Sequence, residues 1–167
     1  MNALVIYESF FGNTRQIAES VARGLASRFE TMAVEVGESD PAMDGARLVV
    51  LGGPTHAFSM TREGSREDAR TQAAEKGITA PSERDGIREL IERLPTTRGK
   101  SDDPLFATFD TVIKKGFWLP TGSAAGSAAK RIKKKGYELA IDPEQFHVSG
   151  TDGPLLEGEV ERAEQWG

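Results

Sequence analysis

The chain has 167 residues, of which 38% are hydrophobic, and its formal net charge is -5 at pH 7. This length is typical of one domain with a sizeable core, so we expect a single domain over residues 1–167. The negative charge argues against nucleic acid as the main partner, because the phosphate backbone would be repelled.

Cysteine is absent and there are only two histidines, His56 and His147. The absence of cysteine excludes disulfides, cysteine nucleophiles and iron–sulfur clusters, and the donor set predicts no metal site. No apolar run is long enough for a membrane span, which takes about 18 residues. The first apolar run begins almost at Met1, so we expect no signal peptide and a cytoplasmic location.

Short apolar runs rich in β-branched and aromatic residues predict the strands. They lie at residues 3–7, 31–36, 47–51, 105–109 and 137–141, with 146–148 as a short extension of the last. The run at 47–51 is the most apolar, which predicts a central position in the sheet.

Helical periodicity appears between and after these runs. Ile17, Val21, Leu25 and Phe29 are spaced four apart, which predicts an amphipathic helix directly after the first loop. Further helices are predicted at residues 66–76, 84–94, 122–135 and 157–166. The alternation of strands and helices predicts an α/β fold with a parallel sheet. Residues 61–81 are almost without large apolar side chains, and we expect most of them at the surface.

The first strand is followed by Ser9-Phe10-Phe11-Gly12-Asn13-Thr14, here called the 9–14 loop. A polar loop between a strand and a helix brings hydroxyls and backbone N–H groups to a helix N-terminus, where an anion is favoured. An ordinary helix cap would also explain these residues. The loop contains no Gly-Lys-Ser/Thr, which argues against an NTPase, and the Rossmann Gly-x-Gly-x-x-Gly is absent.

The third strand leads into Gly52-Gly53-Pro54-Thr55-His56-Ala57-Phe58. This segment and the 9–14 loop follow strands 1 and 3, where a doubly wound sheet changes its winding direction and binds ligands. The 9–14 loop resembles the flavodoxin phosphate loop, Ser/Thr-x-Thr-Gly-x-Thr, and residues 52–58 resemble the loop after strand 3 of flavodoxin-like proteins. The resemblance implies a three-layer, doubly wound five-stranded parallel sheet of order 2-1-3-4-5 and a bound FMN.

The resemblance also implies roles for particular residues. Ser9, Asn13 and Thr14 would hold the FMN phosphate, together with the backbone N–H groups from Phe10 to Thr14, a stretch that includes Phe11 and Gly12. Pro54, Thr55, His56, Ala57 and Phe58 would lie along the isoalloxazine ring. Thr111 and Trp118, after the fourth strand, complete the candidate cofactor-binding residues, although packing within the loop would explain Trp118 equally well. No catalytic residue is assigned.

Two features depart from electron-carrier flavodoxins. Phe11 stands where many flavodoxins have a second Thr, which removes one hydroxyl from the phosphate site. The segment after the fourth strand, residues 110–120, has lysines where an acidic segment and a stacking Tyr are usual.

Three functions therefore remain open. The first is an FMN-binding electron-transfer protein that serves redox partner proteins. The second is an FMN-dependent reductase of a quinone or another small molecule, using NAD(P)H. The third is a flavodoxin-like binding module that has lost the cofactor. The basic run at 130–135 is either a solvated helix end or a docking patch for an acidic redox partner.

Overall fold

The computed structural model describes residues 2–37, 43, 45–79, 85–97, 99, 102–114 and 122–167. Its centre is a five-stranded parallel sheet of order β2-β1-β3-β4-β5. The strands are β1 (Asn2–Tyr7), β2 (Glu30–Glu35), β3 (Ala46–Pro54), β4 (Leu105–Ile113) and β5 (Glu144–Val148). This confirms the predicted fold class and strand order, with β3 in the centre.

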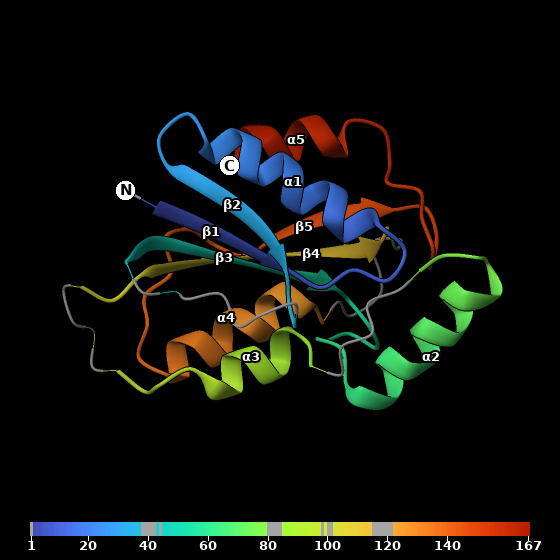
Figure 1. Cartoon of the computed structure of the whole chain (residues 1–167), viewed down its shortest axis with the longest axis horizontal. Coiled ribbons are helices and arrows are strands. Elements are labelled where there is room, and N and C mark those ends of the chain that lie inside the picture. The colour runs from blue at the N-terminus through green and yellow to red at the C-terminus, as the bar shows by residue number, and fades with distance from the viewer. Residues whose placement is uncertain are drawn as a thin grey trace.

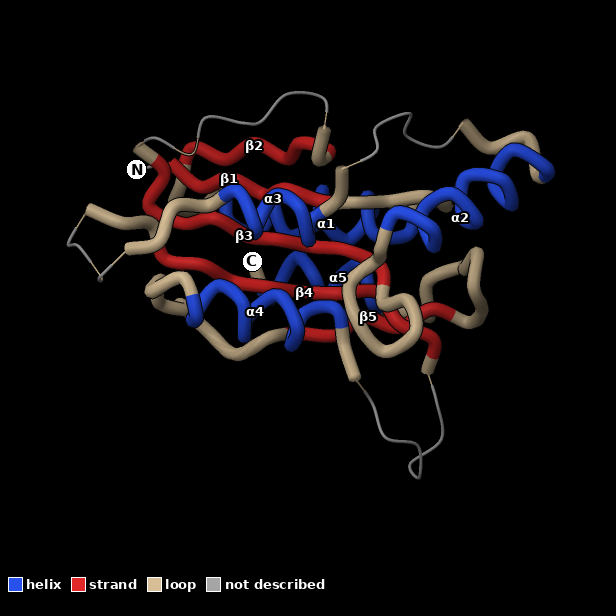
Figure 2. Tube along the Cα trace, turned by 90° about the horizontal axis from the view of Figure 1, so that it is seen from below, coloured by secondary structure: helices blue, strands red, loops and turns tan. Residues whose placement is uncertain are grey.

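Two helices cover each face of the sheet, as Figure 1 shows. On one face lie α1 (Asn13–Leu25) and α5 (Glu159–Trp166), and on the other lie α3 (Ile87–Arg93) and α4 (Ala124–Lys134). The helix α2 (Glu63–Glu75) belongs to neither layer. It lies beyond the carboxyl ends of the strands, as both Figure 1 and Figure 2 show.

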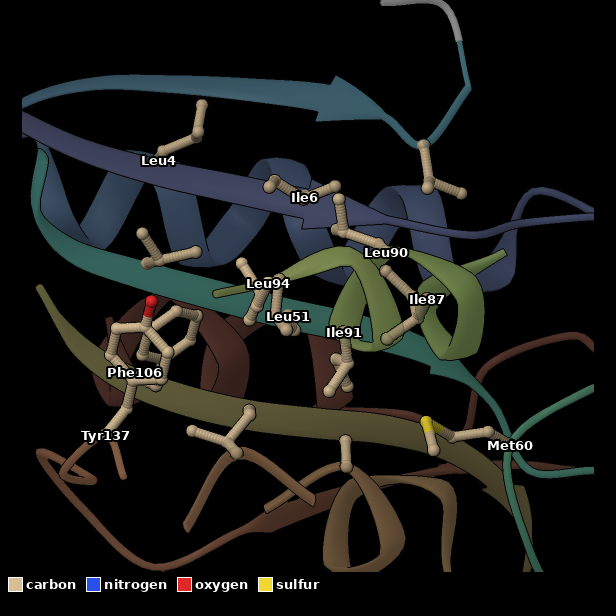
Figure 3. Close-up of a cluster of buried hydrophobic side chains, with 14 of the residues drawn as sticks. Leu4, Ile6, Leu51, Met60, Ile87, Leu90, Ile91, Leu94, Phe106 and Tyr137 are labelled. Carbon is tan, nitrogen blue, oxygen red and sulfur yellow. The ribbon is translucent and has the colours of Figure 1, made fainter. Parts of the chain in front are cut away.

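Side-chain alternation along the strands separates the core into two clusters. In β1, Leu4 and Ile6 face α3 and α4, whereas Val5 faces α1 and α5. Figure 3 shows the first cluster, in which Ile91 of α3 packs beside Leu51 of β3. Since both faces of the sheet are buried, the strands have the continuous apolar character that distinguished them in the sequence.

The fifth strand was predicted in the wrong place. Residues 137–141 form only an isolated bridge, between Leu139 and Phe106, and β5 lies where the sequence suggested a mere extension. Tyr137 is buried because its ring packs edge-on against Phe106, with centroids 5.0 Å apart, so its apolar environment comes from core packing. The ladder with β4 begins only after Pro143, at Glu144.

Two further differences from the prediction bear on the core and on the candidate site. α1 ends at Leu25, and Phe29 packs against the core from the following turn. β4 continues to Ile113, so residues 110–113 belong to a strand and not to the loop that follows it. As a result, Thr111 sits on a rigid element at the edge of the candidate site.

Candidate functional site

A pocket of about 370 Å³ opens at the carboxyl ends of β1, β3 and β4. It is the place where the doubly wound topology predicts a ligand. Nearly all the candidate residues line it together: Ser9, Phe10, Phe11, Asn13, Thr14, Pro54, Thr55, His56, Ala57, Phe58 and Thr111. Gly12 shapes the wall without lining it, and Trp118 lies outside the described residues.

The 9–14 loop passes from β1 to the N-terminus of α1. Gly12 occupies the N-cap position of α1 with a φ of 85°, a left-handed conformation that favours glycine. The backbone N–H of Arg15 donates to the Ser9 hydroxyl at 3.3 Å. No described residue accepts a hydrogen bond from the backbone N–H groups of Phe11, Gly12 or Asn13. These donors, at the positive end of the α1 dipole, suit an anion.

Two side chains expected on the phosphate are already engaged within the protein. Asn13 donates through Nδ2 to the backbone oxygen of Asp152 at 3.1 Å, which ties the 9–14 loop to the segment before α5. The hydroxyls of Thr14 and Thr111 lie 2.7 Å apart and share one hydrogen bond. An anion bound at this loop would therefore meet mainly backbone N–H groups, with one hydroxyl hydrogen of the Thr pair left to donate.

The turn after β3 is strained. His56 and Ser59 exchange two backbone hydrogen bonds, of 2.9 and 3.0 Å, across a tight turn. Its two central residues, Ala57 and Phe58, have φ angles of 45° and 64°, which non-glycine residues rarely adopt. Phe58 remains 51% exposed beside the pocket. Such strain is retained where the surrounding structure fixes it, and it is concentrated at binding sites.

Gly122 allows this turn to approach α4 closely. A Cβ atom added at residue 122 would lie 2.2 Å from the backbone oxygen of Phe58, so only glycine fits there. Ser59 also meets α4, with its hydroxyl oxygen 3.1 Å from that of Ser127. The turn is thus held in place from outside the pocket.

Asp110 fixes the start of α4 beneath the same turn. Its Oδ2 accepts hydrogen bonds from the Thr55 hydroxyl at 2.8 Å and from the Ala125 N–H at 2.9 Å. The Ala124 N–H donates to the Thr55 hydroxyl at 2.8 Å. Burial raises the pKa of Asp110, and the hydrogen bonds it accepts oppose that shift. The carboxylate therefore joins β4, the turn after β3 and the N-terminus of α4.

A second buried carboxylate lies directly before the 9–14 loop. Glu8 accepts a hydrogen bond from the Thr61 hydroxyl at 2.6 Å, and burial raises its pKa. Arg66, only 2% exposed, donates to the same hydroxyl at 3.2 Å and pairs with Glu89 at 3.1 Å. The sequence predicts Arg66 on a helix in a surface segment and gives no sign of this network, because nothing in the pattern of residues 61–81 marks Arg66 as buried.

One wall of the pocket was not predicted from the sequence. α2 contributes Ser65, Ala69 and Gln72, which are spaced as one face of a helix. β5 contributes Gln145 and His147. None of these positions stands out in the sequence, because the α2 residues form no apolar face and Gln145 and His147 belong to no recognisable motif.

The chemistry of the pocket matches a phosphorylated aromatic ligand. Backbone donors gather at one end, and Phe10, Phe11 and Phe58 supply apolar surface. Among the described residues, no cluster of His, Asp or Glu could hold a metal ion. No helix in the described part of the chain is long and apolar enough to cross a membrane.

No protein-family model matches the chain, and no curated protein matches its sequence. Solved structures do match over nearly its whole length. Flavodoxin 1 from Bacillus cereus superposes with a TM-score of 0.66 at 12% identity, covering 99% of this chain and 94% of the other. A Streptococcus pneumoniae flavodoxin gives 0.65 at 17% identity, with the same coverage.

A flavodoxin-like WrbA-like protein from Agrobacterium tumefaciens gives a TM-score of 0.56 at 16% identity, covering 99% of this chain and 91% of the other. Identities this low establish the architecture and not the activity. Together with the strand order, they show that the chain has the flavodoxin-like fold.

Proposed function

We propose that this chain binds FMN in the pocket at the carboxyl ends of β1, β3 and β4, and that it transfers electrons to and from redox partner proteins. One observation carries the proposal. The N–H groups of Phe11, Gly12 and Asn13, for which the described residues provide no acceptor, belong to a loop that lines the same pocket as the strained turn Thr55–Ser59 and Thr111. The phosphoryl group would bind at the N-terminus of α1, and the isoalloxazine ring would lie toward Pro54–Phe58.

In this arrangement the redox chemistry is that of the bound flavin, and the protein supplies orientation and electrostatics. The 9–14 loop holds the phosphate end, and Gly12 lets the backbone approach it. Asp110 and Gly122 fix the turn that lies against the ring. None of these residues needs to gain or lose a proton for electrons to pass, which suits an electron carrier.

A specific observation supports the alternative, a reductase of a quinone or another small molecule. The pocket continues to the side chains of Gln145 and His147 and is walled by α2. A wall of this kind provides room for a substrate beside the cofactor. The steady-state rate of NAD(P)H oxidation in the presence of a quinone distinguishes the two functions. An electron carrier should show no turnover, whereas a reductase should show it.

Titration of the apoprotein with FMN tests the proposal itself. We expect the fluorescence of FMN to be quenched with one equivalent bound, and the complex to show the absorption bands of a flavoprotein. A protein that stays colourless after FMN is offered would instead support the third reading, a binding module without a cofactor.

A further inference from the structure

The helix α2 lies across the open end of the proposed site. Figures 1 and 2 place it beyond the carboxyl ends of the strands, clear of both helical layers. Ser65, Ala69 and Gln72 line the pocket from one face of α2, and the next residue at this spacing is Lys76, which caps the C-terminus of the helix. The face of α2 that lines the pocket is therefore followed, at the C-terminal end of the helix, by a cation.

The N-terminal part of α2 is anchored deeply. The guanidinium of Arg66 is buried with the Thr61 hydroxyl and the Glu89 carboxylate, at 3.2 and 3.1 Å. This anchor fixes the direction in which the helix leaves the sheet, so the position of its C-terminal end is also determined.

The C-terminal end of α2 meets the 9–14 loop. The Lys76 ammonium lies 6.0 Å from the centroid of the Phe11 ring and forms an ion pair with Asp152. The same Asp152 accepts a hydrogen bond from Asn13 through its backbone oxygen. Lys76 thus stands beside the loop whose backbone N–H groups have no described acceptor. The Lys76 and Asp152 side chains are 48% and 44% exposed, so the pair by itself contributes little to stability.

The loop has a deficit of positive charge for a phosphate dianion. The sequence suggests a site made of hydroxyls and N–H groups alone. In the structure the Asn13 side chain and one of the two hydroxyl hydrogens of Thr14 and Thr111 already make hydrogen bonds within the protein. Arg15, in the first turn of α1, is paired with Glu19 at 2.8 Å. Lys76 reaches the loop from a different element and has a flexible stem that allows it to turn from Asp152 to a bound anion.

We propose that Lys76, carried across the 9–14 loop by α2, is a ligand of the cofactor's phosphoryl group and makes the site select FMN over riboflavin. The inference rests on the proposed function and goes beyond it, because it assigns phosphate selectivity to an element outside the strand–loop–helix unit. Phe11, which removes a hydroxyl from the loop, then has a positive role: its ring supports the lysine stem and ammonium.

The test compares FMN with riboflavin, which lacks the phosphate, by fluorescence titration of the apoprotein. We expect Lys76→Gln to weaken FMN binding by about tenfold, as expected for losing one charge-assisted hydrogen bond, and to leave riboflavin binding unchanged. The dependence of FMN affinity on salt should also become shallower in this variant. Lys130→Gln, at an exposed position of α4 far from the pocket, is the matched control and should alter neither affinity.

The Asp152→Asn variant distinguishes two roles of Lys76: a ligand of the phosphate, or a residue that only holds α2 in place. If Lys76 binds the phosphate, removing its competing carboxylate should strengthen FMN binding and leave riboflavin binding unchanged. If Lys76 only fastens α2, the same change should weaken both flavins. That result, or an equal loss of both flavins in Lys76→Gln, would overturn the inference while FMN binding by the wild type stands. A wild type that binds neither flavin would instead refute the proposed function, and the inference with it.

Discussion

The hydroxyl oxygens of Thr14 and Thr111 lie 2.7 Å apart, although 97 positions separate the two residues in the chain. Thr14 belongs to the first turn of α1 and Thr111 to the end of β4, and both line the pocket. Their hydrogen bond fixes the start of α1 against the sheet at the edge of the pocket.

Replacing Thr111 by Val keeps its shape and removes its hydroxyl. The buried Thr14 hydroxyl then loses its partner, so we expect the free energy of unfolding to fall by about 1 kcal/mol. Urea denaturation measures this loss. Thr111→Ser keeps the hydroxyl and should retain most of the stability; a Val variant as stable as the Ser variant would show that the hydrogen bond contributes nothing.

The left-handed conformation of Gly12 gives a second prediction. A Cβ at Gly12 would meet no atom within 4 Å, so Gly12→Ala carries a backbone cost without a clash. We expect the variant to lose about 1 kcal/mol, the usual cost of a left-handed alanine. Gly64, in α2, also has open space around it but has no positive φ, so Gly64→Ala should be neutral or stabilising. Equal effects of the two changes on thermal unfolding would contradict this reading.

The third prediction concerns the buried guanidinium of Arg66. Arg66→Ala leaves the Glu8 and Glu89 carboxylates near one another without their cation, so we expect a loss of about 3–5 kcal/mol, the range for breaking a buried ion pair. Because α2 depends on this anchor, its amides should exchange with solvent faster in the variant. The exposed Arg28 provides the control: Arg28→Ala should change stability by less than about 0.5 kcal/mol. Similar losses in both variants would rule out a special role for Arg66.

The fourth prediction concerns pH. The pKa of Asp110 is raised by burial, so between its ordinary value of about 4 and its raised value the folded chain binds more protons than the unfolded chain. The stability that Asp110 contributes therefore falls as the pH rises through this window. Asp110→Asn cannot titrate and can keep the contacts to Thr55 and Ala125.

The comparison is made by denaturant titration of both proteins at several pH values. We expect the stability of Asp110→Asn relative to the wild type to increase from about pH 4 upward and to level off above the raised pKa. A difference that stays constant with pH would show that Asp110 titrates at its ordinary pKa.

The sequence predicts most of the architecture because the spacing of hydrophobic residues reflects which faces of the helices and strands are buried. It predicts the sheet order through the resemblance, and the two loops of the pocket through their position after strands 1 and 3. The fifth strand was misplaced because Tyr137 and Leu139 are apolar for reasons of core packing, while β5 has only Phe146 and Val148 buried. The local sequence pattern does not distinguish an apolar segment that packs in the core from an apolar segment that forms a strand.

The α2 wall was beyond prediction for a different reason. Its sequence has no apolar face, and the features that place it are single contacts between distant residues: Arg66 with Glu89, and Lys76 with Phe11. Charged residues in a polar segment usually face solvent, so their pairing depends on tertiary structure. The role of Trp118 stays a prediction, since it lies outside the described residues.

The most direct test of the account is an amide ¹H–¹⁵N NMR titration of the apoprotein with FMN. We expect the largest chemical-shift changes at the N–H groups of Phe11, Gly12, Asn13 and Thr14. A second group should appear at Thr55–Phe58, and the changes in β2, which contributes no residue to the pocket, should be small. Binding of FMN that leaves the amides of the 9–14 loop unmoved, or no binding at all, would contradict it.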